Sequence, residues 1–586
     1  MVTPEVWAPS AERVELVWND GGISTEDRTV SMRPFDRGWW RADQELGRGA
    51  RYRFALDGGA PLADPRALRL PNGPDGAAEV VDLSDLPWTD RDWAGVELEG
   101  AIVYELHVGT FTTEGTLDAA VERLDHLVDL GVGLVELMPV ASFPGRYGWG
   151  YDGVGLWAVH EPYGGPHALG RFVDACHTRG LAVCLDVVYN HLGPSGNRLP
   201  VFGPYFTDQY QTPWGQAVNL DGAGSDEVRR FIIDNAVMWL RDLHIDALRL
   251  DAVHALHDER ALPLLEQLSA EVDVLAARLG RPLWLIAESD RNDPGTVTPR
   301  SDGGAGIHAQ WADDVHHGLH VALTGETQGY YADFDGPGAL AKVLTTVFLH
   351  DGTWSAFRGR THGRPVDRAR TPGWRFVVSL QTHDQVGNRA TGDRLSATLD
   401  PGVLACGAAL LLTGPGTPML FMGEEWGAST PWQYFTDHPD PELAEAVRQG
   451  RRREFASHGW APEDVPDPQD AGTVERSRLD WAEPDREPHA QLLGWYRDLI
   501  ALRRERADLR DPRLDQVVVH HDPVARTVVV RRDRHRVAVN LADGPARLDL
   551  GVAGLVVTLA WDPAATTVRG PLVELPARSA AVLGPA

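Results

Sequence analysis

The sequence predicts an α/β protein built on a (β/α)8 TIM barrel, with an N-terminal β-sandwich and a C-terminal β-sandwich domain. The 586 residues exceed what a single ordinary core accommodates. Both outer parts of the chain alternate apolar and polar residues as strands do, whereas the long middle part alternates short apolar strands with segments of helical period. We therefore expect an immunoglobulin-like or carbohydrate-binding-module-like sandwich at 1–90, the barrel with insertions at 91–510, and the second sandwich at 511–586.

The two outer segments show the period of two that is typical of strands. In the first, Gly, Pro and Asp clusters separate runs of alternating apolar residues, among them Val14, Leu16 and Trp18, and Tyr52, Phe54 and Leu56. In the last, the stretches VVVHH, TVVVRRD and RVAVNL recur at a spacing of about ten residues. Each pattern indicates a small β-sandwich.

The middle segment alternates strands and helices from about Ala101 onward. Helices are predicted near 116–130 and 166–179, over a segment that places Val228 and Trp239 on one face, and over 265–279. The strands are AIVYELHVGTF, LVELMPV, LAVCLDVVYNH, ALRLDAV, LWLIAES, FVVSLQTHD and TPMLFMGEEWG, with a Gly-rich, less legible stretch before FVVSLQTHD. About eight such units over some four hundred residues favour a closed barrel, and a doubly wound open sheet is the alternative.

The composition is that of a soluble globular protein, with 43% hydrophobic and 24% charged residues. The net charge of -29 argues against nucleic acid and anionic membranes as partners, so a neutral substrate fits better. No apolar run approaches the roughly 20 residues of a membrane span, and MVTPEVWAPS lacks the regions of a signal peptide, so we predict a cytoplasmic protein. The surplus of 20 tryptophans suits a ligand with flat C–H faces, such as a sugar.

The three cysteines argue against a disulfide framework in so long a chain. Cys176 shares a helical face with Leu169, Phe172 and Val173. We therefore expect it to be a buried core thiol, in preference to a functional one.

The stretch DALRLDAVH, from Asp246 to His254, places charge inside an apolar strand, and burying charge without a partner is costly. Residues two apart in a strand face the same side, so Arg249 and Asp251 project together. They stand at the C-terminal end of the strand, where barrel enzymes build their sites. The arginine is expected to keep the aspartate ionised at neutral pH.

Polar residues also follow three other apolar strands. LDVVYNH contains Asp186 and ends in Asn190 and His191, LWLIAESD contains Glu288, and SLQTHDQ contains His383 and Asp384. Any one of these groups alone could be solvated loop residues. Together they indicate convergence on one mouth of the barrel.

Carboxylates, one arginine and two histidines, without a Cys/His metal cluster or a phosphate-binding glycine loop, suit hydrolysis of a glycosidic bond. That reaction needs one ionised and one protonated carboxyl. Asp251, beside Arg249, is the predicted nucleophile, and Glu288, with no basic residue before Arg291, is the predicted acid. Carboxyl groups about 5 to 5.5 Å apart would make the enzyme a retaining one.

Four short motifs, DVVYNH, LRLDAVH, AES and THD, resemble those of the α-amylase superfamily, glycoside hydrolase family 13. The resemblance implies that Asp251 is the nucleophile, Glu288 the general acid/base and Asp384 the stabiliser of the distorted ring. It also implies that Arg249, His191 and His383 contact the sugar at the cleavage point. Thr382 departs from the family, which often has Asn there, and it flanks the chemistry.

Longer stretches resemble the maltooligosyltrehalose trehalohydrolase group of this superfamily. They include MPVASFPGRYGWGYDGVGLWAVHEPYGGP, QWADDVHHGLHVALTGETQGYYADF and HDQVGNRA, and the likeness covers nearly the whole chain. The group is expected to cut the α-1,4 bond that joins a maltooligosaccharide to a terminal trehalose. It shares the N-terminal sandwich with branching and debranching enzymes.

The same resemblance implies further contacts with the substrate. His254 is expected to reach the leaving-group sugars, and a second set is expected to line the trehalose site, namely Asp313, Asp314, His316, His317, Gln385 and Asn388. His316 and His317 could instead begin a helix and only pack. Trp149 and Tyr151 resemble an aromatic platform beside the cleaved glucose, and the alternative is that they are ordinary core aromatics.

We predict no metal and no cofactor. Asn190 matches a calcium position of many amylases, but the group does not need calcium and the sequence shows no assignable set of oxygen ligands. The expected partner is the oligosaccharide substrate, and the protein is expected to act alongside a maltooligosyltrehalose synthase without an obligate complex. A glycogen branching enzyme, a general α-1,4-glucan hydrolase and an inactive glycan-binding protein are the competing interpretations.

Overall fold

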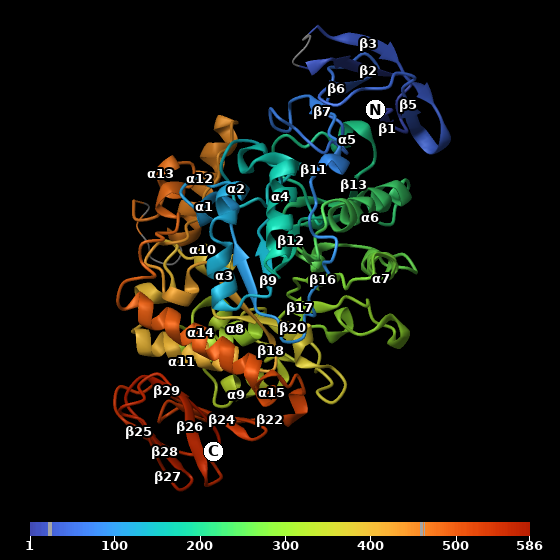
Figure 1. Cartoon of the computed structure of the whole chain (residues 1–586). Coiled ribbons are helices and arrows are strands. Elements are labelled where there is room, and N and C mark those ends of the chain that lie inside the picture. Colours follow the sequence, from blue (N-terminus) through green and yellow to red (C-terminus); the bar gives the residue numbers. More distant parts are fainter. Residues whose placement is uncertain (22–25, 457–460, 462) are drawn as a thin grey trace.

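The computed structural model describes residues 1–21, 26–456, 461 and 463–586. Its centre is a closed barrel of parallel strands, so the (β/α)8 prediction is confirmed and the open-sheet alternative is wrong (Figure 1). In order around the barrel the strands are β8 (Val103–Leu106), β9 (Leu134–Leu137), β12 (Ala182–Val187), β15 (Ala247–Leu250), β16 (Trp284–Ala287), β17 (Ala309–Trp311), β20 (Phe376–Ser379) and β21 (Thr417–Phe421).

Apolar side chains fill the barrel toward the amino ends of its strands, and polar side chains follow toward the carboxyl ends. The interior cluster includes Val103, Leu134, Ala247, Ile286 and Met419. Side chains two residues apart share a face, and on three of these strands the next inward position holds an ionisable group. Those positions are Glu105 on β8, Glu136 on β9 and Arg249 on β15, all of them buried.

Helices surround the barrel where the periodicity predicts them. The expected helix at 166–179 is α4 (Gly165–Thr178), and the next two are α6 (Ser225–Asp242) and α7 (Leu264–Leu279). The helix expected at 116–130 is divided into α2 (Leu117–Val121) and α3 (Leu124–Leu130). Both parts still bury one continuous apolar face, so the helical period holds across the break.

The less legible stretch before FVVSLQTHD contains the sixth barrel strand and its helix. The strand β17 has three residues, too few for an alternating pattern, and α8 (Asp313–Thr324) follows directly. Later helices include α9 (Ala339–Thr346), α11 (Pro401–Leu412), α12 (Pro441–Ala456) and α14 (His489–Glu505).

Two antiparallel sheets lie before the barrel. One contains β3 (Arg28–Ser31), β2 (Val14–Asn19), β6 (Arg51–Leu56) and β7 (Ala78–Glu79), and the other contains β1 (Glu5–Trp7), β5 (Trp39–Arg41) and β4 (Arg33–Pro34). β2 and β6 carry the two alternating runs seen in the sequence and pair with each other, Leu16 opposite Phe54.

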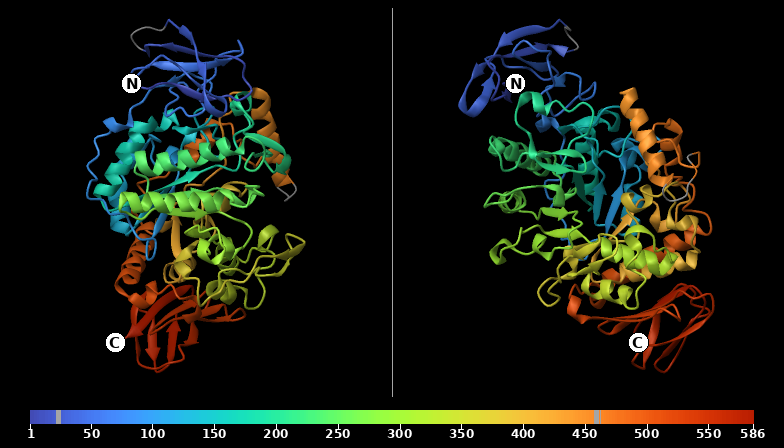
Figure 2. Two further views of the ribbon diagram at one scale, coloured as in Figure 1. Left: turned by 90° about the vertical axis from the view of Figure 1, so that its right-hand side faces the viewer. Right: turned by 180° about the vertical axis from the view of Figure 1, so that it is seen from behind.

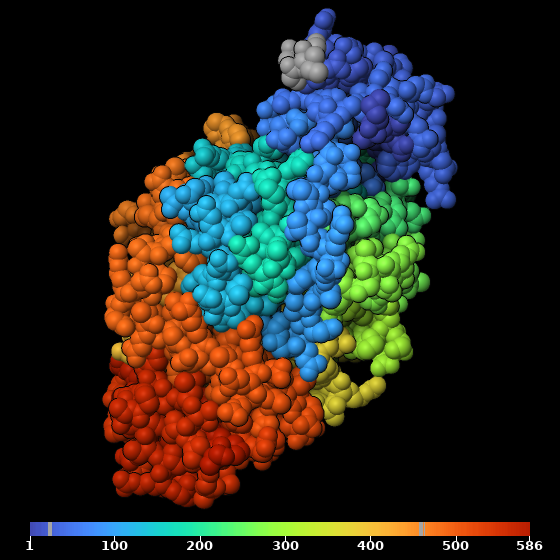
Figure 3. All heavy atoms as spheres, in the orientation of Figure 1, coloured from blue at the N-terminus to red at the C-terminus, as the bar shows by residue number. Residues whose placement is uncertain are grey.

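Two further sheets follow the barrel. β22 (Val517–Asp522), β23 (Thr527–Arg532), β24 (His535–Asn540), β29 (Ser579–Pro585) and β26 (Leu555–Ala560) form one, and β25 (Ala546–Asp549), β28 (Leu572–Leu575) and β27 (Thr567–Arg569) form the other. The N-terminal and C-terminal sheets lie at opposite ends of the molecule, with the barrel between them (Figure 2 and Figure 3).

Two predictions from composition can be checked in the described residues. The three cysteines are free and buried, and Cys176 packs in the core with Phe172 and Val173, so its assignment as a core thiol is confirmed. Across the described parts of the chain, no helix has the length and apolar character needed to cross a membrane.

Candidate active site

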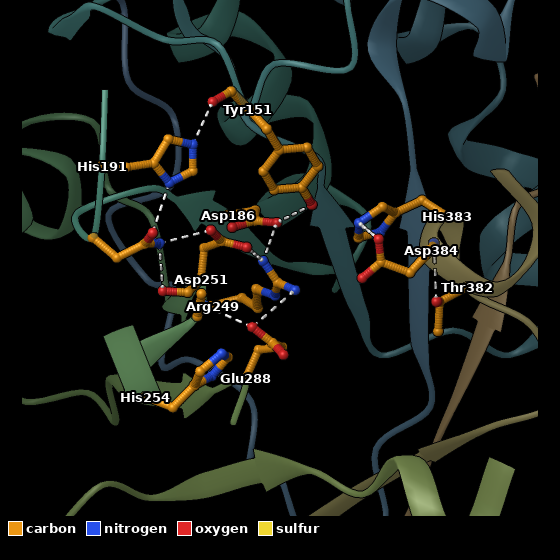
Figure 4. A network of polar contacts seen from close by, with 12 residues as sticks. Tyr151, Asp186, His191, Arg249, Asp251, His254, Glu288, Thr382, His383 and Asp384 are labelled. Atoms are coloured by element: carbon orange, nitrogen blue, oxygen red, sulfur yellow. Dashed lines mark hydrogen bonds and ion pairs between the residues drawn. The ribbon is translucent and has the colours of Figure 1, made fainter. Parts of the chain in front are cut away.

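Arg249 is the centre of the polar groups at the carboxyl ends of the strands (Figure 4). It is completely buried, and its Nη1 donates to Asp186 Oδ2 at 2.9 Å and to Asp251 Oδ1 at 2.6 Å. Its Nη2 lies 4.0 Å from Glu288 Oε2. The arginine inside strand DALRLDAVH is therefore paired with carboxylates on both sides, which compensates the cost of its burial.

Asp251 directly follows β15 and has donors on both carboxyl oxygens. Arg249 donates to Oδ1, and Asn190 Nδ2 donates to Oδ2 at 2.7 Å and to the Asp251 carbonyl at 3.0 Å. Two donors on one carboxyl favour the ionised form, which accepts hydrogen bonds and donates none. This is the protonation state that a nucleophile requires.

Glu288 follows β16 and has the opposite character. Burial, which outweighs the attraction of Arg249, raises the pKa of Glu288 to about 8, and the charge of Asp251 acts in the same direction. This carboxyl is therefore protonated at neutral pH. The pair thus supplies one ionised and one protonated group, as general acid catalysis at a glycosidic bond requires.

The backbone after Asp251 fixes which oxygen of Glu288 carries the proton. The Ala252 N–H donates to Glu288 Oε2 at 2.6 Å, so that oxygen acts as an acceptor and the proton belongs on Oε1. Ala252 has φ 39° and ψ 50°, a left-handed conformation that is strained for a residue with a side chain. The strain turns this N–H toward the acid.

Asp186 and Tyr151 complete one wall. Tyr151 Oη donates to Asp186 Oδ2 at 2.7 Å, and the Tyr151 ring stacks on His383 with 5.1 Å between ring centroids. Burial raises the pKa of Asp186 to about 7, against the opposing charge of Arg249. Tyr151 is thus held by its hydroxyl, and its ring faces the site (Figure 4).

Asp384 and His383 begin the short helix α10 (His383–Gly387), and Thr382 caps it by accepting from the Asp384 N–H at 3.2 Å. His383 Nε2 lies 3.4 Å from Asp384 Oδ1. Burial lowers the pKa of His383, but the charges of Asp384 and Glu105 outweigh it and raise the pKa to about 9. The histidine is therefore an imidazolium at neutral pH.

His191, expected at the cleavage point, and His254, expected to reach the leaving-group sugars, have separate contacts. His191 contacts Asn190 Oδ1 at 2.6 Å and the Tyr151 carbonyl at 3.1 Å, and it stacks on the exposed Trp214 at 4.6 Å. His254 accepts from the Asp290 N–H at 3.4 Å. Burial lowers the pKa of both histidines, which are therefore neutral at pH 7.

The predicted trehalose contacts on α8 separate into two kinds. Burial raises the pKa of Asp313 to about 7, and the charge of Asp384 acts in the same direction. Asp313 therefore lies close enough to Asp384 to interact with its charge. Asp314 is instead enclosed, because its Oδ2 accepts from Asn292 Nδ2, from the Leu349 N–H at 2.7 Å and from the His350 N–H at 3.0 Å. Asp314 therefore connects helix α8 to the loops that contain Asn292 and residues 349–350.

His316 and His317 also differ from each other. Both lie inside α8, as the packing alternative expected, and their Nδ1 atoms are 3.0 Å apart. His316 is buried, whereas His317 is half-buried and stacks at 4.8 Å on Tyr330, which is exposed. Of the two, the structure brings only His317 toward the solvent.

Three other predicted contacts have distinct environments. Trp149 is buried, stacks on Trp432 at 5.3 Å and donates from Nε1 to the Gln433 carbonyl, so it packs as a core aromatic does. Gln385 is half-buried and accepts a hydrogen bond from the Thr382 hydroxyl. Asn388 is exposed at the end of α10.

Several exposed aromatic residues around this mouth were not predicted from the sequence. Trp214 lies in the turn between β13 (Phe206–Thr212) and β14 (Gly215–Val218), and Tyr330 contacts Phe357 at 6.1 Å. The available signal was the presence of large aromatics inside polar, turn-rich stretches such as QTPWGQ, where no core requires them.

The described residues contain no group of three or more His, Cys, Asp or Glu side chains arranged to hold a metal ion. Asn190 donates from Nδ2 to Asp251 Oδ2 at 2.7 Å, and its Oδ1 contacts His191 Nδ1 at 2.6 Å.

The chain is similar to known proteins over nearly its whole length. Residues 88–198 match the family described as alpha amylase, catalytic domain, and residues 512–582 match the domain of unknown function DUF3459. The malto-oligosyltrehalose trehalohydrolase of Arthrobacter ramosus is 60% identical over 85% of this chain and 86% of its own, and that of Rhizobium sp. (strain M-11) is 53% identical over 99% and 97%. A putative alpha amylase from Salmonella typhimurium has a similar structure, with a TM-score of 0.89 and 36% identity over 99% of this chain and 97% of its own.

Proposed function

Because this chain belongs to the malto-oligosyltrehalose trehalohydrolase family of α-amylase-type glycosidases, we propose that it releases trehalose from the end of maltooligosyltrehalose. The bond cleaved is the α-1,4-glucosidic bond next to the terminal trehalose, and the other product is a maltooligosaccharide. The observation that carries the proposal is the carboxyl pair around Arg249, in which Asp251 accepts from Arg249 and Asn190 and burial raises the pKa of Glu288 to about 8.

We propose that the reaction is retaining and has two steps, with Asp251 as the nucleophile and Glu288 as the acid. In the first step Asp251 attacks the anomeric carbon, the C–O bond to trehalose breaks, and Glu288 Oε1 gives its proton to the departing oxygen. In the second step the Glu288 carboxylate takes a proton from water, and that water displaces Asp251 from the glycosyl ester. Asp384 and His383 are the proposed partners of the ring hydroxyls, with Arg249 holding Asp251 in place.

The substrate contacts proposed from the sequence gain unequal support from the structure. Asp313 and His317 are half-buried, and Tyr151 offers a ring whose hydroxyl is held by Asp186. Asp314, His316 and Trp149 are enclosed by protein, so we propose that they act by supporting their neighbours.

A comparison of two substrates tests the proposal. We expect rapid release of trehalose from maltotriosyltrehalose and slow or no cleavage of maltopentaose, measured by chromatography of the products. Equal cleavage of both would show a general α-1,4-glucan hydrolase, and an altered iodine stain of amylose without free disaccharide would show a branching enzyme. Binding without any product would show an inactive glycan-binding protein.

The dependence of rate on pH should follow the two carboxyls. Glu288 must hold its proton, so kcat/KM should fall as the pH rises through about 8. Asp251 must be ionised, so kcat/KM should also fall at acidic pH, giving a bell. Initial rates of trehalose release between about pH 4 and about pH 9 measure this, and a flat profile over that range would contradict the acid and nucleophile pair.

We extend the proposal to trehalose biosynthesis in the cytoplasm, after a maltooligosyltrehalose synthase and without an obligate complex. The support is chemical, because the α,α-1,1-linked end of the substrate must be made by another enzyme before this chain can release it. We also propose the boundaries 1–90, 91–510 and 511–586 for the two sandwiches and the catalytic barrel, with the N-terminal sheets as an accessory to the glucan site.

A further inference from the structure

Two buried glutamates lie side by side in the barrel interior beneath the catalytic groups. Glu105 on β8 and Glu136 on β9 are register partners, and each has a relative exposure of 1%. Both follow an apolar residue of the interior cluster by two positions, Val103 and Leu134, so both carboxyls face the barrel axis. The reaction described above assigns neither of them a task.

Glu105 is bonded through both oxygens to one residue of the site. The His383 backbone N–H donates to Oε2 at 3.0 Å, and the His383 Nδ1 contacts Oε1 at 2.5 Å. Because an ionised carboxyl only accepts hydrogen bonds, Nδ1 must carry a proton. The ring is thus fixed at Nδ1, and Nε2 is left on the side of Asp384, 3.4 Å from Oδ1.

The neighbours of His383 show which contact fixes the orientation of its ring. Tyr151 and Trp311 cover the imidazole ring of His383. The Tyr151 ring stacks on it with 5.1 Å between ring centroids, and the Trp311 ring is tilted against it with 6.0 Å between ring centroids. The charged or titratable groups that act on it from the packed elements are Glu105 on β8, Glu136 on β9, Asp186 on β12, Arg249 on β15, His107 and Asp384. Of these, Glu105 bonds both to the ring and to the backbone that carries it.

We propose that Glu105 is a positioning residue for the reaction, which holds His383 with Nδ1 protonated and Nε2 directed at Asp384 and at the sugar bound there. The inference rests on the proposed function, because it assigns Glu105 a task in that same site. With a proton on each ring nitrogen, His383 can donate from Nε2 to a ring hydroxyl while Asp384 accepts from another. Hydrogen bonds to the ring hydroxyls strengthen as the oxocarbenium-like transition state forms, so misplacement of His383 should reduce kcat more than it raises KM.

Glu136 provides a matched control at the same depth of the barrel. Burial, followed by the charge of Glu105, raises the pKa of Glu136 to about 8, so this carboxyl is neutral at pH 7. Replacing it by Gln therefore keeps both its shape and its charge at that pH. Replacing Glu105 by Gln keeps the shape and removes the charge that faces His383.

The test compares Glu105→Gln and Glu136→Gln with the wild type between pH 5 and pH 10, by kcat and KM for trehalose release from maltotriosyltrehalose. For Glu105→Gln we expect kcat to fall about 100-fold, KM to change less than about threefold, and the alkaline limb of kcat/KM to move to lower pH. For Glu136→Gln we expect kcat at pH 6 within about threefold of the wild type and a smaller displacement of the alkaline limb.

Equal losses in both variants, or a Glu105→Gln enzyme with the wild-type rate and profile, would overturn the proposal. Thermal melting by circular dichroism establishes that each variant is folded. If Glu105→Gln does not fold, Glu105→Asp keeps the charge and shortens the side chain, so kcat should fall while the alkaline limb stays in place, and a wild-type kcat would then overturn the proposal. Wild-type protein that cleaves an α-1,4-glucan but releases no trehalose would refute the proposed function alone, and the variants would then be compared on that glucan.

Discussion

Replacement of Asp251 by Asn is expected to lower kcat by about 10⁴-fold or more, because an amide cannot form the glycosyl ester. The oxygen of the introduced amide can still accept from Arg249 Nη1, which donates to Asp251 Oδ1 at 2.6 Å in the wild type, whereas the amide nitrogen replaces the acceptor of Asn190 Nδ2 and loses that one hydrogen bond. Binding of a maltooligosaccharide should therefore remain within about tenfold of the wild type.

Initial rates of trehalose release and calorimetric binding of maltopentaose measure the two quantities separately. Asp302→Asn is a suitable control, because Asp302 is exposed at the surface and pairs there with Arg370. That substitution should leave both quantities unchanged. Hydrolysis retained in Asp251→Asn would refute the assignment of the nucleophile, and loss of both turnover and binding would show that the site had lost its shape.

Replacement of Glu288 by Gln is expected to reduce kcat on maltotriosyltrehalose by about 10³-fold to 10⁴-fold, because trehalose then departs without a proton. The Ala252 N–H can still donate to the oxygen of the introduced amide, as it does to Glu288 Oε2 at 2.6 Å in the wild type. The fall of kcat/KM on the alkaline side, which is expected near pH 8 in the wild type, should weaken in this variant because the group that titrates there is absent.

A substrate whose leaving group needs no proton separates the two roles. α-Maltosyl fluoride releases fluoride without acid assistance, so the first step of Glu288→Gln should be slowed far less on this substrate than on maltotriosyltrehalose. Asp251→Asn supplies the contrast, since it should lose activity on both substrates. An equal loss by Glu288→Gln on both would contradict its role as the acid and would indicate a structural one.

The strands that could be predicted are those with long apolar runs between turn residues. AVCLDV in β12 and TPMLF in β21 are such runs, and both form barrel strands. β17 could not be identified, because it has three residues, contains the polar Gln310 and follows a stretch with three glycines in four positions, 303–306. Its place is determined by pairing with β16 and β20, which are distant in sequence.

The candidate site shows the same division. Asp251 and Glu288 could be predicted because each directly follows an apolar strand, and the chain order of a barrel brings such positions together. The different environments of Asp313 and Asp314 could not be predicted, since adjacent residues of one type carry no difference in pattern. The backbone amides at 349–350 and the Asn292 side chain, which enclose Asp314, come from loops that only the fold brings close.

Glu105 shows a signal that was present in the sequence and not used. It lies within the apolar stretch AIVYELHVG, just as Arg249 lies within ALRLDAV. A charged residue in the middle of a buried strand requires a partner, and here the partner is His383, 278 positions further along the chain. The sequence can indicate that such a partner exists, but the fold is needed to identify it.

The burial of all three cysteines leaves the described surface without a reactive thiol, because burial raises the pKa of each thiol and keeps it in the unreactive form. A single cysteine introduced at an exposed position would therefore be the only one open to a maleimide dye or spin label. Trp354, exposed on the β18 (Thr353–Ser355) and β19 (Arg360–His362) hairpin, offers such a position. A reporter attached there would measure whether this hairpin changes its environment when the oligosaccharide binds and when its products leave.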